Sequence, residues 1–187
     1  MQNQASRSAP RPGGRSARVQ AAVHQAVQRL QDQAGRDGLT IPAIAAEAGV
    51  TPSTIYRRWG DLGQLLADVA LEQLRPESPP EDTGSFEGDL RAWLAQYFEE
   101  MASEPGRAML RDVLGSAGTD GQERCMHFCT AQIDALRARG LQRGEAVVAT
   151  ESIVDQVIAP LMYRILFAGT TPTTADIERR LAPNLPR

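Results

Sequence analysis

The sequence predicts an all-α protein of about nine helices, with a small N-terminal module followed by a larger C-terminal helical domain. Apolar residues recur at helical spacing along most of the 187 residues, and no alternation of period two persists that would indicate a strand. Between the two parts, residues 75–84 contain three prolines, which lack an N–H and disfavour the α conformation in the preceding residue. We therefore expect a flexible arm at residues 1–14, the module at 15–75 and the domain at 76–187.

The composition indicates a globular protein with neither a membrane anchor nor a disulfide framework. Hydrophobic residues make up 42% of the chain, but no run approaches the ~18 consecutive apolar residues of a membrane-spanning helix. The N-terminal residues are polar and rich in proline and glycine, unlike a secretory signal, so we expect a cytoplasmic protein. Cys125 and Cys129 are the only cysteines, too few to staple a secreted domain.

The charges are distributed unevenly, although the net charge of the whole chain is only -3. Residues 1–75 contain nine arginines and six acidic residues, whereas residues 76–187 contain eleven arginines and seventeen acidic residues. The first part is therefore positive and the second negative. This asymmetry is typical of a protein in which one part meets the phosphates of a nucleic acid and the other does not.

Capping and breaking residues divide the N-terminal module into short helices. Thr40 and Thr51 are typical N-caps, and Pro52 occupies a first helical position, where its missing N–H costs nothing. Gly35 and Gly49 are expected to end the helices that precede them, since glycine readily adopts the left-handed conformation of a helix C-terminus. The expected helices cover about residues 16–34, 41–48, 52–59 and 62–74.

The C-terminal domain is predicted to contain at least five further helices. The clearest runs from Phe86 to Met101, where apolar residues form a broad stripe. Gly140 is expected to end one of the helices, and Pro160 to kink another. The five helices cover about residues 86–101, 106–114, 121–139, 143–168 and 174–181.

The second and third predicted helices form a candidate helix-turn-helix motif. Both are short, and the tight turn Ala48-Gly49-Val50 joins them. Ile55 and Trp59 are expected on the inward face of the third helix, whereas the outward face carries hydroxyl groups and arginines that packing does not require. In such a motif the second helix of the pair lies in the major groove of DNA, where its N-terminal residues meet the edges of bases.

Residues 44–59, with the sequence IAAEAGVTPSTIYRRW, resemble the signature of the TetR family of repressors, in which a G-V-[ST]-x-x-T-[IL]-Y core precedes an aromatic or apolar residue. The similarity covers about residues 15–75. It implies a homodimeric repressor that binds a palindromic operator, with two recognition helices about one DNA turn apart, and that a small ligand releases. It also implies that Thr40, Thr54 and Tyr56 contact phosphates, and that five residues lie nearest the bases: Thr51, Pro52, Ser53, Arg57 and Arg58.

One position departs from the family pattern. TetR-family proteins usually carry a lysine at the start of the fourth helix, where it meets a phosphate, but Asp61 and Leu62 stand there in this sequence. The departure implies a weaker salt dependence of operator binding and a lower affinity, unless other arginines compensate. The candidates for this compensation are Arg57, Arg58 and the arm residues Arg7, Arg11 and Arg15, of which the arm residues would enter a minor groove. It also leaves an alternative open, a protein-interaction module that keeps the helix-turn-helix shape without binding DNA.

The C-terminal domain is expected to bind a small ligand and a second copy of the chain. Its apolar interior suits an apolar or aromatic ligand, although the same side chains would also serve as an ordinary core. The apolar surface of the helix at 143–168 is too wide for one neighbouring helix, which favours an interface with a partner. The candidate ligand-binding residues are Trp93, Tyr97, Met101, Leu110 and Phe128, and the candidate interface residues are Val154, Ile158, Leu161, Met162 and Ile165.

No catalytic or metal site is predicted. Cys125 and Cys129 lie one helical turn apart, but His127 points away from them, which leaves only two ligands for a metal ion. A redox role for the cysteines stays open beside the favoured interpretation, which is that they are small core residues. His24 and His127 have no nucleophile at a useful spacing, so we expect neither an enzyme nor a cofactor.

Overall fold

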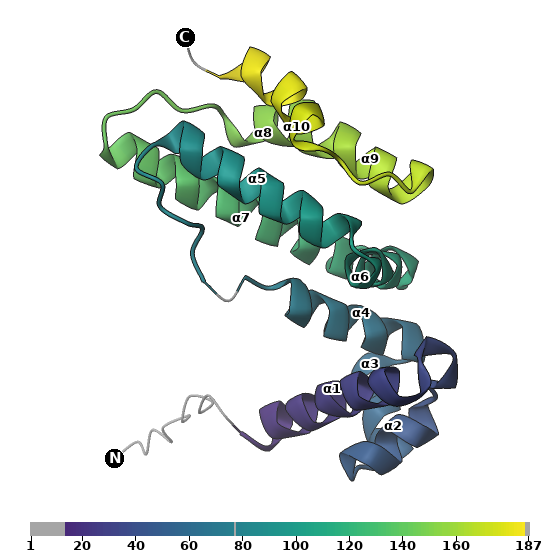
Figure 1. Ribbon diagram of the computed structural model, residues 1–187. Coiled ribbons are helices and arrows are strands. Elements are labelled where there is room, and N and C mark those ends of the chain that lie inside the picture. Colours follow the sequence, from purple (N-terminus) through teal and green to yellow (C-terminus); the bar gives the residue numbers. More distant parts are fainter. Residues whose placement is uncertain (1–13, 77, 186–187) are drawn as a thin grey trace, which may run out of the picture. The chain divides into compact units, whose positions relative to one another are not determined.

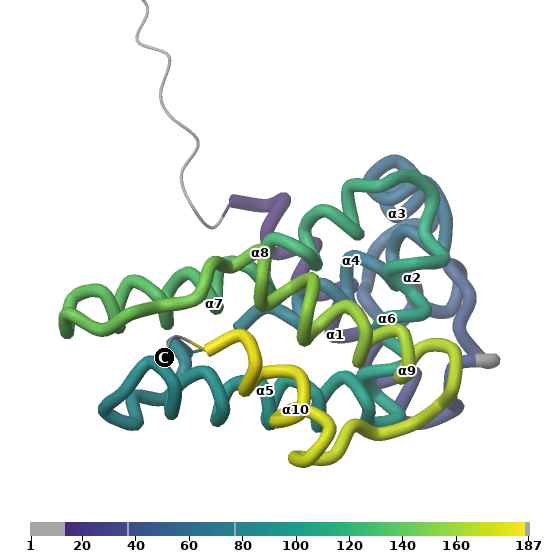
Figure 2. Tube along the Cα trace, turned by 90° about the horizontal axis from the view of Figure 1, so that it is seen from above, coloured from purple at the N-terminus to yellow at the C-terminus, as the bar shows by residue number. Residues whose placement is uncertain are grey.

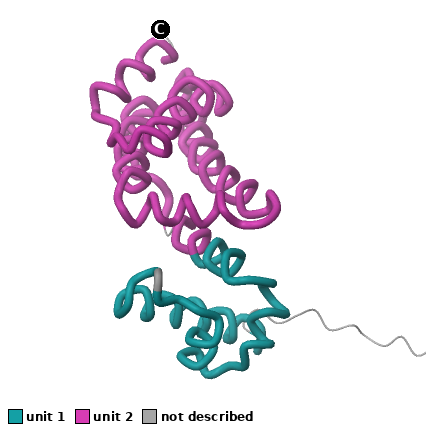
Figure 3. The backbone as a smooth tube through the Cα atoms, turned by 90° about the vertical axis from the view of Figure 1, so that its right-hand side faces the viewer, with its two compact units in different colours: residues 1–69 teal, residues 70–187 magenta. Residues whose placement is uncertain are grey.

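The computed structural model describes residues 14–76 and 78–185, and all regular structure in these ranges is helical (Figure 1). The all-α prediction is therefore confirmed. The chain divides into two compact units, Met1–Val69 and Ala70–Arg187, which Figure 3 colours separately. The arm expected at residues 1–14 lies outside the described residues except for Gly14, and so do Arg7 and Arg11.

The division between the two units falls inside a helix, α4 (Leu62–Leu74). Leu65 and Val69 belong to the core of the first unit, whereas Ala70 and Leu71 are buried together with Val113 of the second. The last turn of α4 therefore packs with the second unit, although it precedes the proline-rich segment at which we expected the boundary.

The helices between residues 15 and 69 form the first unit around one small core. α1 (Arg15–Ala34) contacts α2 (Ile41–Ala48), and α2 contacts α3 (Pro52–Trp59). A 3-10 turn, η1 (Arg36–Gly38), lies between α1 and α2 and was not expected from the sequence. The predicted bounds of α3 and α4 are confirmed. The centre of the core consists of side chains without solvent exposure: Val23, Ala26, Val27, Ile44, Ile55 and Leu65.

Gly49 makes the tight turn between α2 and α3. Its φ of +67° lies in the left-handed region, which residues with a Cβ adopt at a cost. The Gly49 N–H donates to Ala46 O at 3.3 Å and the Val50 N–H donates to Ala45 O at 2.9 Å, the two bonds of a Schellman motif. This motif satisfies carbonyl groups at the end of α2 and leads the chain directly into the next helix.

The helices of the second unit pack against α5 (Phe86–Ala102) (Figure 2). The helices in contact with α5 are α6 (Glu104–Gly115), α7 (Asp120–Gln142), α9 (Ala159–Ala168) and α10 (Thr174–Leu181). α8 (Thr150–Ile153), a π-helical stretch η2 (Val154–Ile158) and α9 follow one another without a break. Counted in this way, the described residues form nine separate helices longer than one 3-10 turn, as predicted. None of the described helices is both long and apolar enough to cross a bilayer.

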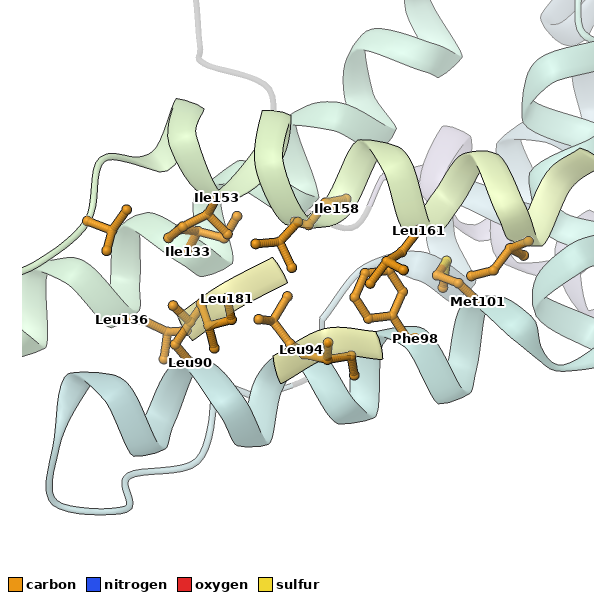
Figure 4. Packing of buried hydrophobic residues seen from close by; sticks show 14 of the residues in the cluster. Leu90, Leu94, Phe98, Met101, Ile133, Leu136, Ile153, Ile158, Leu161 and Leu181 are labelled. Carbon is orange, nitrogen blue, oxygen red and sulfur yellow. The ribbon is translucent and has the colours of Figure 1, made fainter. Parts of the chain in front are cut away.

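Side chains from several helices interlock in the core of the second unit (Figure 4). Leu90, Leu94 and Phe98 project from α5 at intervals of four residues, so they share one face of that helix. Each of them is at most 1% exposed. The opposing side chains come from α7, from the continuous helix α8–η2–α9 and from α10: Ile133, Leu136, Ile153, Ile158, Leu161 and Leu181.

The end of α7 differs from the prediction, which placed it at Gly140. Gly140 instead lies buried within the helix, where a Cβ would be 2.9 Å from the Cβ of Phe86 and 2.9 Å from Cγ1 of Val147. The glycine that ends the helix is Gly144, with a φ of +77° and an N–H that donates to Leu141 O at 3.0 Å. Gly140 therefore permits close packing, and Gly144 provides the left-handed C-terminus.

The helix predicted at residues 143–168 is also shorter than expected, because it begins only at Thr150. The preceding residues 145–149 have no regular structure, and the carbonyl of Val148 accepts a hydrogen bond from Arg137 Nε at 2.7 Å. Near Pro160, where we expected a kink, the helix contains the π-helical stretch η2. Prolines and π-helical turns both interrupt the regular hydrogen bonding of an α-helix.

A buried carboxylate anchors the beginning of the second unit. The Asp89 side chain has no solvent exposure and accepts hydrogen bonds from Arg139 Nη1 at 3.1 Å and Arg143 Nη1 at 3.2 Å. It also accepts from the backbone N–H of Thr83 at 2.6 Å and from the Thr83 hydroxyl at 2.8 Å. Burial on its own would raise the pKa of Asp89, but the hydrogen bonds from Thr83, Arg143 and Arg139 outweigh burial and hold this pKa below its usual value.

We predict that Asp89→Asn lowers the free energy of unfolding by about 3 kcal/mol, because two guanidinium groups lose their buried counter-charge. Since the folded pKa of Asp89 is depressed, the carboxylate stabilises the fold above about pH 4 and loses this effect as the pH falls through the folded pKa. Urea unfolding at pH 7 and at about pH 3 measures both effects, and the gap between wild type and variant should narrow in acid. Asp120→Asn, at a 91% exposed side chain, is the control and should change little. An equally small loss for Asp89→Asn would contradict the anchoring role.

We predict that Gly49→Ala costs about 1 kcal/mol of unfolding free energy, because alanine is strained in the left-handed region. No atom lies within 4 Å of the position its Cβ would occupy, so the cost is purely conformational. Gly49→Asn should cost less, since asparagine tolerates this conformation. Gly115→Ala adds a Cβ in equally open space at a residue of α6 without positive φ and should not destabilise. Urea unfolding compares the three, and a stabilising Gly49→Ala would refute the explanation.

Candidate nucleic-acid interface

α3 has one buried edge and one exposed edge. Ile55 is 0% exposed and Trp59 is 6% exposed, and their spacing of four residues places both on the side facing the core of the first unit, as predicted. On the other side, the Tyr56 side chain is 52% exposed and Arg57 is also exposed. Packing within the unit therefore leaves this edge available to a partner.

Hydroxyl groups gather at the N-terminus of α3. Thr51 precedes the helix, but its hydroxyl caps no backbone N–H; it lies 2.9 Å from the Ser53 hydroxyl and 3.0 Å from the Thr54 hydroxyl. Pro52 occupies the first helical position and is exposed. Helix N-termini carry a partial positive charge and N–H groups without helical partners, so this end suits a phosphate oxygen.

Thr40 occupies the equivalent place at the start of α2. Its hydroxyl accepts a hydrogen bond from the backbone N–H of Ala43 at 3.3 Å, which confirms it as an N-cap. The side chain remains exposed, and a hydroxyl that accepts from the backbone can still donate to another oxygen. The N-terminus of α2 therefore offers a second place for a phosphate.

The two arginines of α3 differ in their surroundings. Within the described residues, neither a hydrogen bond nor an ion pair engages the guanidinium of Arg57. Arg58 Nη1 instead donates to the Ser16 carbonyl at 2.9 Å and to the Ser16 hydroxyl at 2.8 Å, and Arg58 Nη2 donates to Gln20 Oε1 at 2.6 Å. The sequence motif gave no indication of this difference between neighbours.

A polar cluster beneath α3 was not expected from the sequence. Asp68 on α4 is its centre: one oxygen, Oδ2, accepts from Trp59 Nε1 at 2.9 Å, from His24 Nε2 at 3.0 Å and from Gln20 Nε2 at 3.2 Å. Its donors come from α1 and α3, so the carboxylate links three helices. The only signal in the sequence is an aspartate between the buried residues of α4.

Asp61 and Leu62 stand at the start of α4, where the family pattern has a lysine. Asp61 Oδ1 accepts from the backbone N–H of Gln64 at 2.8 Å, so Asp61 acts as the cap of this helix. Leu62 is half-buried and packs against the core of the first unit. Neither residue offers a cation to a phosphate. Arg15, the one described residue among the three arm arginines expected to compensate, is exposed at the start of α1.

The five candidate ligand-binding residues do not share one environment. Met101 and Leu110 are buried in the core of the second unit, at 4% and 5% exposure. Trp93, Tyr97 and Phe128 are half-buried. Trp93 and Tyr97 are stacked, with ring centroids 5.1 Å apart and an angle of 22° between the ring planes.

The five candidate interface residues are similarly divided. Ile158, Leu161 and Ile165 are at most 5% exposed and belong to the core of their own chain, while Val154 and Met162 are half-buried. The most exposed apolar side chains of this helix are Tyr163 at 64% and Phe167 at 75%. These two rings contact each other, with centroids 4.8 Å apart.

The cysteines lie in an environment that suppresses thiolate formation. Burial raises the pKa of Cys129 to about 11, although a hydrogen bond with Tyr97 acts in the opposite direction, and burial also raises the pKa of Cys125. Because the thiolate is the reactive form and a raised pKa makes it rarer, these shifts argue against redox sensing by the two cysteines. His127 is exposed, and among the described residues no three side chains of the metal-binding types form a group.

Two family models match the chain. Residues 25–69 match the model described as bacterial regulatory proteins of the tetR family, and residues 80–182 match the tetracyclin repressor-like C-terminal domain. The first match contains α2, α3, Trp59 and Asp68, whereas Gln20 and His24 of the polar cluster lie just before it. The second covers more than half of the chain.

Individual proteins agree with the family models. The HTH-type transcriptional regulator AqdR of Rhodococcus erythropolis is 31% identical over 143 residues, which are 74% of this chain and 69% of AqdR. The HTH-type transcriptional repressor DrrR1 of Streptomyces coeruleorubidus is 31% identical over 144 residues, 73% of this chain and 50% of DrrR1. A crystal structure of a TetR transcriptional regulator from Agrobacterium tumefaciens matches with a TM-score of 0.57 and 22% identity, covering 90% of this chain and 92% of the other. The chain therefore belongs to the TetR family of helix-turn-helix, DNA-binding transcriptional regulators, a family without enzymatic activity.

Proposed function

We propose that this TetR-family regulator is a repressor that binds a palindromic or nearly palindromic operator as a homodimer and dissociates when a small molecule binds. The observation that carries the proposal is the exposed polar edge of α3, opposite buried Ile55 and Trp59. DrrR1, which is named a repressor, supports the negative direction of control. Because the partner is operator DNA, we expect the protein to act in the cytoplasm.

The residues around α3 suit different parts of DNA. Hydroxyls at helix N-termini suit phosphates, and we assign this role to Thr40 and Thr54 together with the phenol of Tyr56. Arg57, whose guanidinium is engaged by none of the described residues, suits the two acceptors of a guanine in the major groove. Thr51, Pro52 and Ser53 lie at the leading end of α3, which in this motif is nearest the bases.

The exposed aromatic pair of α9 supports a dimer. A soluble monomer rarely exposes two adjacent aromatic rings, so Tyr163 and Phe167 suit contact with a second copy. Val154 and Met162, which are half-buried on the same continuous helix, remain candidates for this interface. Ile158, Leu161 and Ile165, which we expected there, are already covered by their own chain. Two-fold pairing through this helix would present two copies of α3 to one duplex.

The half-buried aromatic residues of the second unit support an apolar or aromatic ligand. The Trp93–Tyr97 stack and Phe128 offer apolar surface that the core does not completely cover. The Tyr97 hydroxyl adds one polar group suited to orient a ligand. Met101 and Leu110 lie deeper and would support these residues from behind.

We predict that Arg57→Ala and Tyr56→Ala each weaken operator binding by about ten- to a hundredfold, since each removes a direct DNA contact. Fluorescence anisotropy with a labelled duplex from the region upstream of the protein's own gene measures the affinity. Arg111→Ala is the control, because it removes an exposed arginine of α6 that pairs with Glu104. Wild-type affinity in both variants would show that the exposed edge of α3 is not the surface that contacts DNA.

We predict that light scattering on a sizing column gives the wild type a mass near twice the 20.3 kDa of the chain at micromolar concentration. The double variant Tyr163→Ser/Phe167→Ser should raise the dimer dissociation constant by about a hundredfold or more, because four rings lose their apolar burial. Leu141→Ser, at a 59% exposed residue of α7, serves as the control. A stable wild-type monomer would rule out the dimer, and an unaffected double variant would rule out this interface.

A further inference from the structure

Arg58 is the last residue but one of α3, and its guanidinium forms hydrogen bonds with residues of another helix. Three hydrogen bonds of 2.6–2.9 Å join it to Ser16 and Gln20 of α1. Its Cζ also lies 5.1 Å from the centre of the Trp59 ring, within the range of a cation–π contact. These contacts use donors on both terminal nitrogens, which a DNA contact would otherwise need.

Gln20 continues this connection into the interior of the unit. Its Oε1 accepts from Arg58, and its Nε2 donates to Asp68 Oδ2 at 3.2 Å. The same carboxylate oxygen accepts from the indole N–H of Trp59 at 2.9 Å. Arg58 and Trp59, adjacent at the C-terminal end of α3, are thus both held by one polar network that reaches α1 and α4.

The network compensates for the small contact area of α3. The helix has eight residues and buries only Ile55 and Trp59, so apolar contact alone restrains its rotation about its own axis weakly. Forked hydrogen bonds from a planar guanidinium are directional and restrain that rotation. Base recognition needs side chains held within about half an ångström of the correct place, so the rotation of α3 matters for affinity.

We propose that Arg58 is a positioning residue: it orients α3 through Ser16 and Gln20, and Arg57 is the arginine of the pair that contacts DNA. The role of Arg58 rests on the proposed function, in which the edge of α3 meets the operator. It departs from the family resemblance, which placed both arginines nearest the bases.

Operator affinity over a range of salt concentrations tests this assignment with matched variants. Arg58→Met should weaken binding about tenfold but leave the slope of log affinity against log salt unchanged, because no phosphate contact is lost. The fold-change in affinity caused by Arg58→Met should be much smaller when Gln20→Met is already present. The fold-changes caused by Arg57→Met and Gln20→Met should instead multiply in the double variant, because these two residues act independently. The proposal would be overturned if each replaced Arg58 reduced the slope of log affinity against log salt by about 0.9 and if the fold-changes caused by Arg58→Met and Gln20→Met multiplied.

Arg58→Lys separates geometry from charge. Lysine keeps the positive charge but cannot donate to Ser16 and Gln20 through one rigid fork, so we expect affinity close to that of Arg58→Met. Wild-type affinity for Arg58→Lys would mean that the charge alone matters, and the positioning role would be wrong.

Amide hydrogen exchange of the DNA-free protein provides a readout that does not depend on the operator. Exchange at residues 56–60 should accelerate about tenfold in Arg58→Met and Gln20→Met and stay unchanged in Arg57→Met, since only the first two loosen α3. Equal exchange in all variants would refute the positioning role. Failure of the proposed function has a different signature, namely wild-type operator affinity in Arg57→Met and also in Tyr56→Ala.

Discussion

The burial of Ile55 and Trp59 on one edge of α3 is the constraint on which the first unit depends. A helix of eight residues makes little more than two turns, so two apolar residues four apart define its buried edge and thereby its exposed one. Burying Trp59 also buries an indole N–H, which would be costly without an acceptor. Asp68 supplies that acceptor at 2.9 Å, and the requirement for it explains an acidic residue among the apolar positions of α4.

Each unit contains a carboxylate of low exposure that accepts hydrogen bonds from several separate segments. Asp68 accepts from Gln20, His24 and Trp59, whereas Asp89 accepts from two arginines and from Thr83. A carboxylate is stable in such a place only when enough donors surround it. Because these bonds are directional, each carboxylate orients helices that apolar contacts alone would leave freer to rotate and slide.

Most helix positions could be predicted because they follow from residues close together in the chain. The cap of α2, the proline at the start of α3 and the apolar spacing of α4 all act within about four residues. The error at the end of α7 arose because one residue type has two uses. Gly140 and Gly144 look alike in the sequence, but one permits the approach of Phe86 and the other provides a positive φ.

The candidate sites were predictable to different degrees for the same reason. The family signature lies within residues 44–59 and placed the exposed edge of α3 correctly. The helix containing Ile158, Leu161 and Ile165 is apolar on several sides, and its sequence does not indicate which side faces its own core. Burial selected these three for the core and left Tyr163 and Phe167 outside.

The all-helical class, the helix-turn-helix and membership of the TetR family follow from the sequence alone, because periodicity, caps and a contiguous motif are local properties. The packing of the helices is needed to show which of two adjacent arginines is engaged by its own chain and what lies beneath Trp59. Arg58 meets Ser16 across 42 positions of sequence, and His24 meets Asp68 across 44. Such hydrogen bonds depend on the angle at which packed helices cross and on side-chain direction, and no local pattern in the chain encodes either of them.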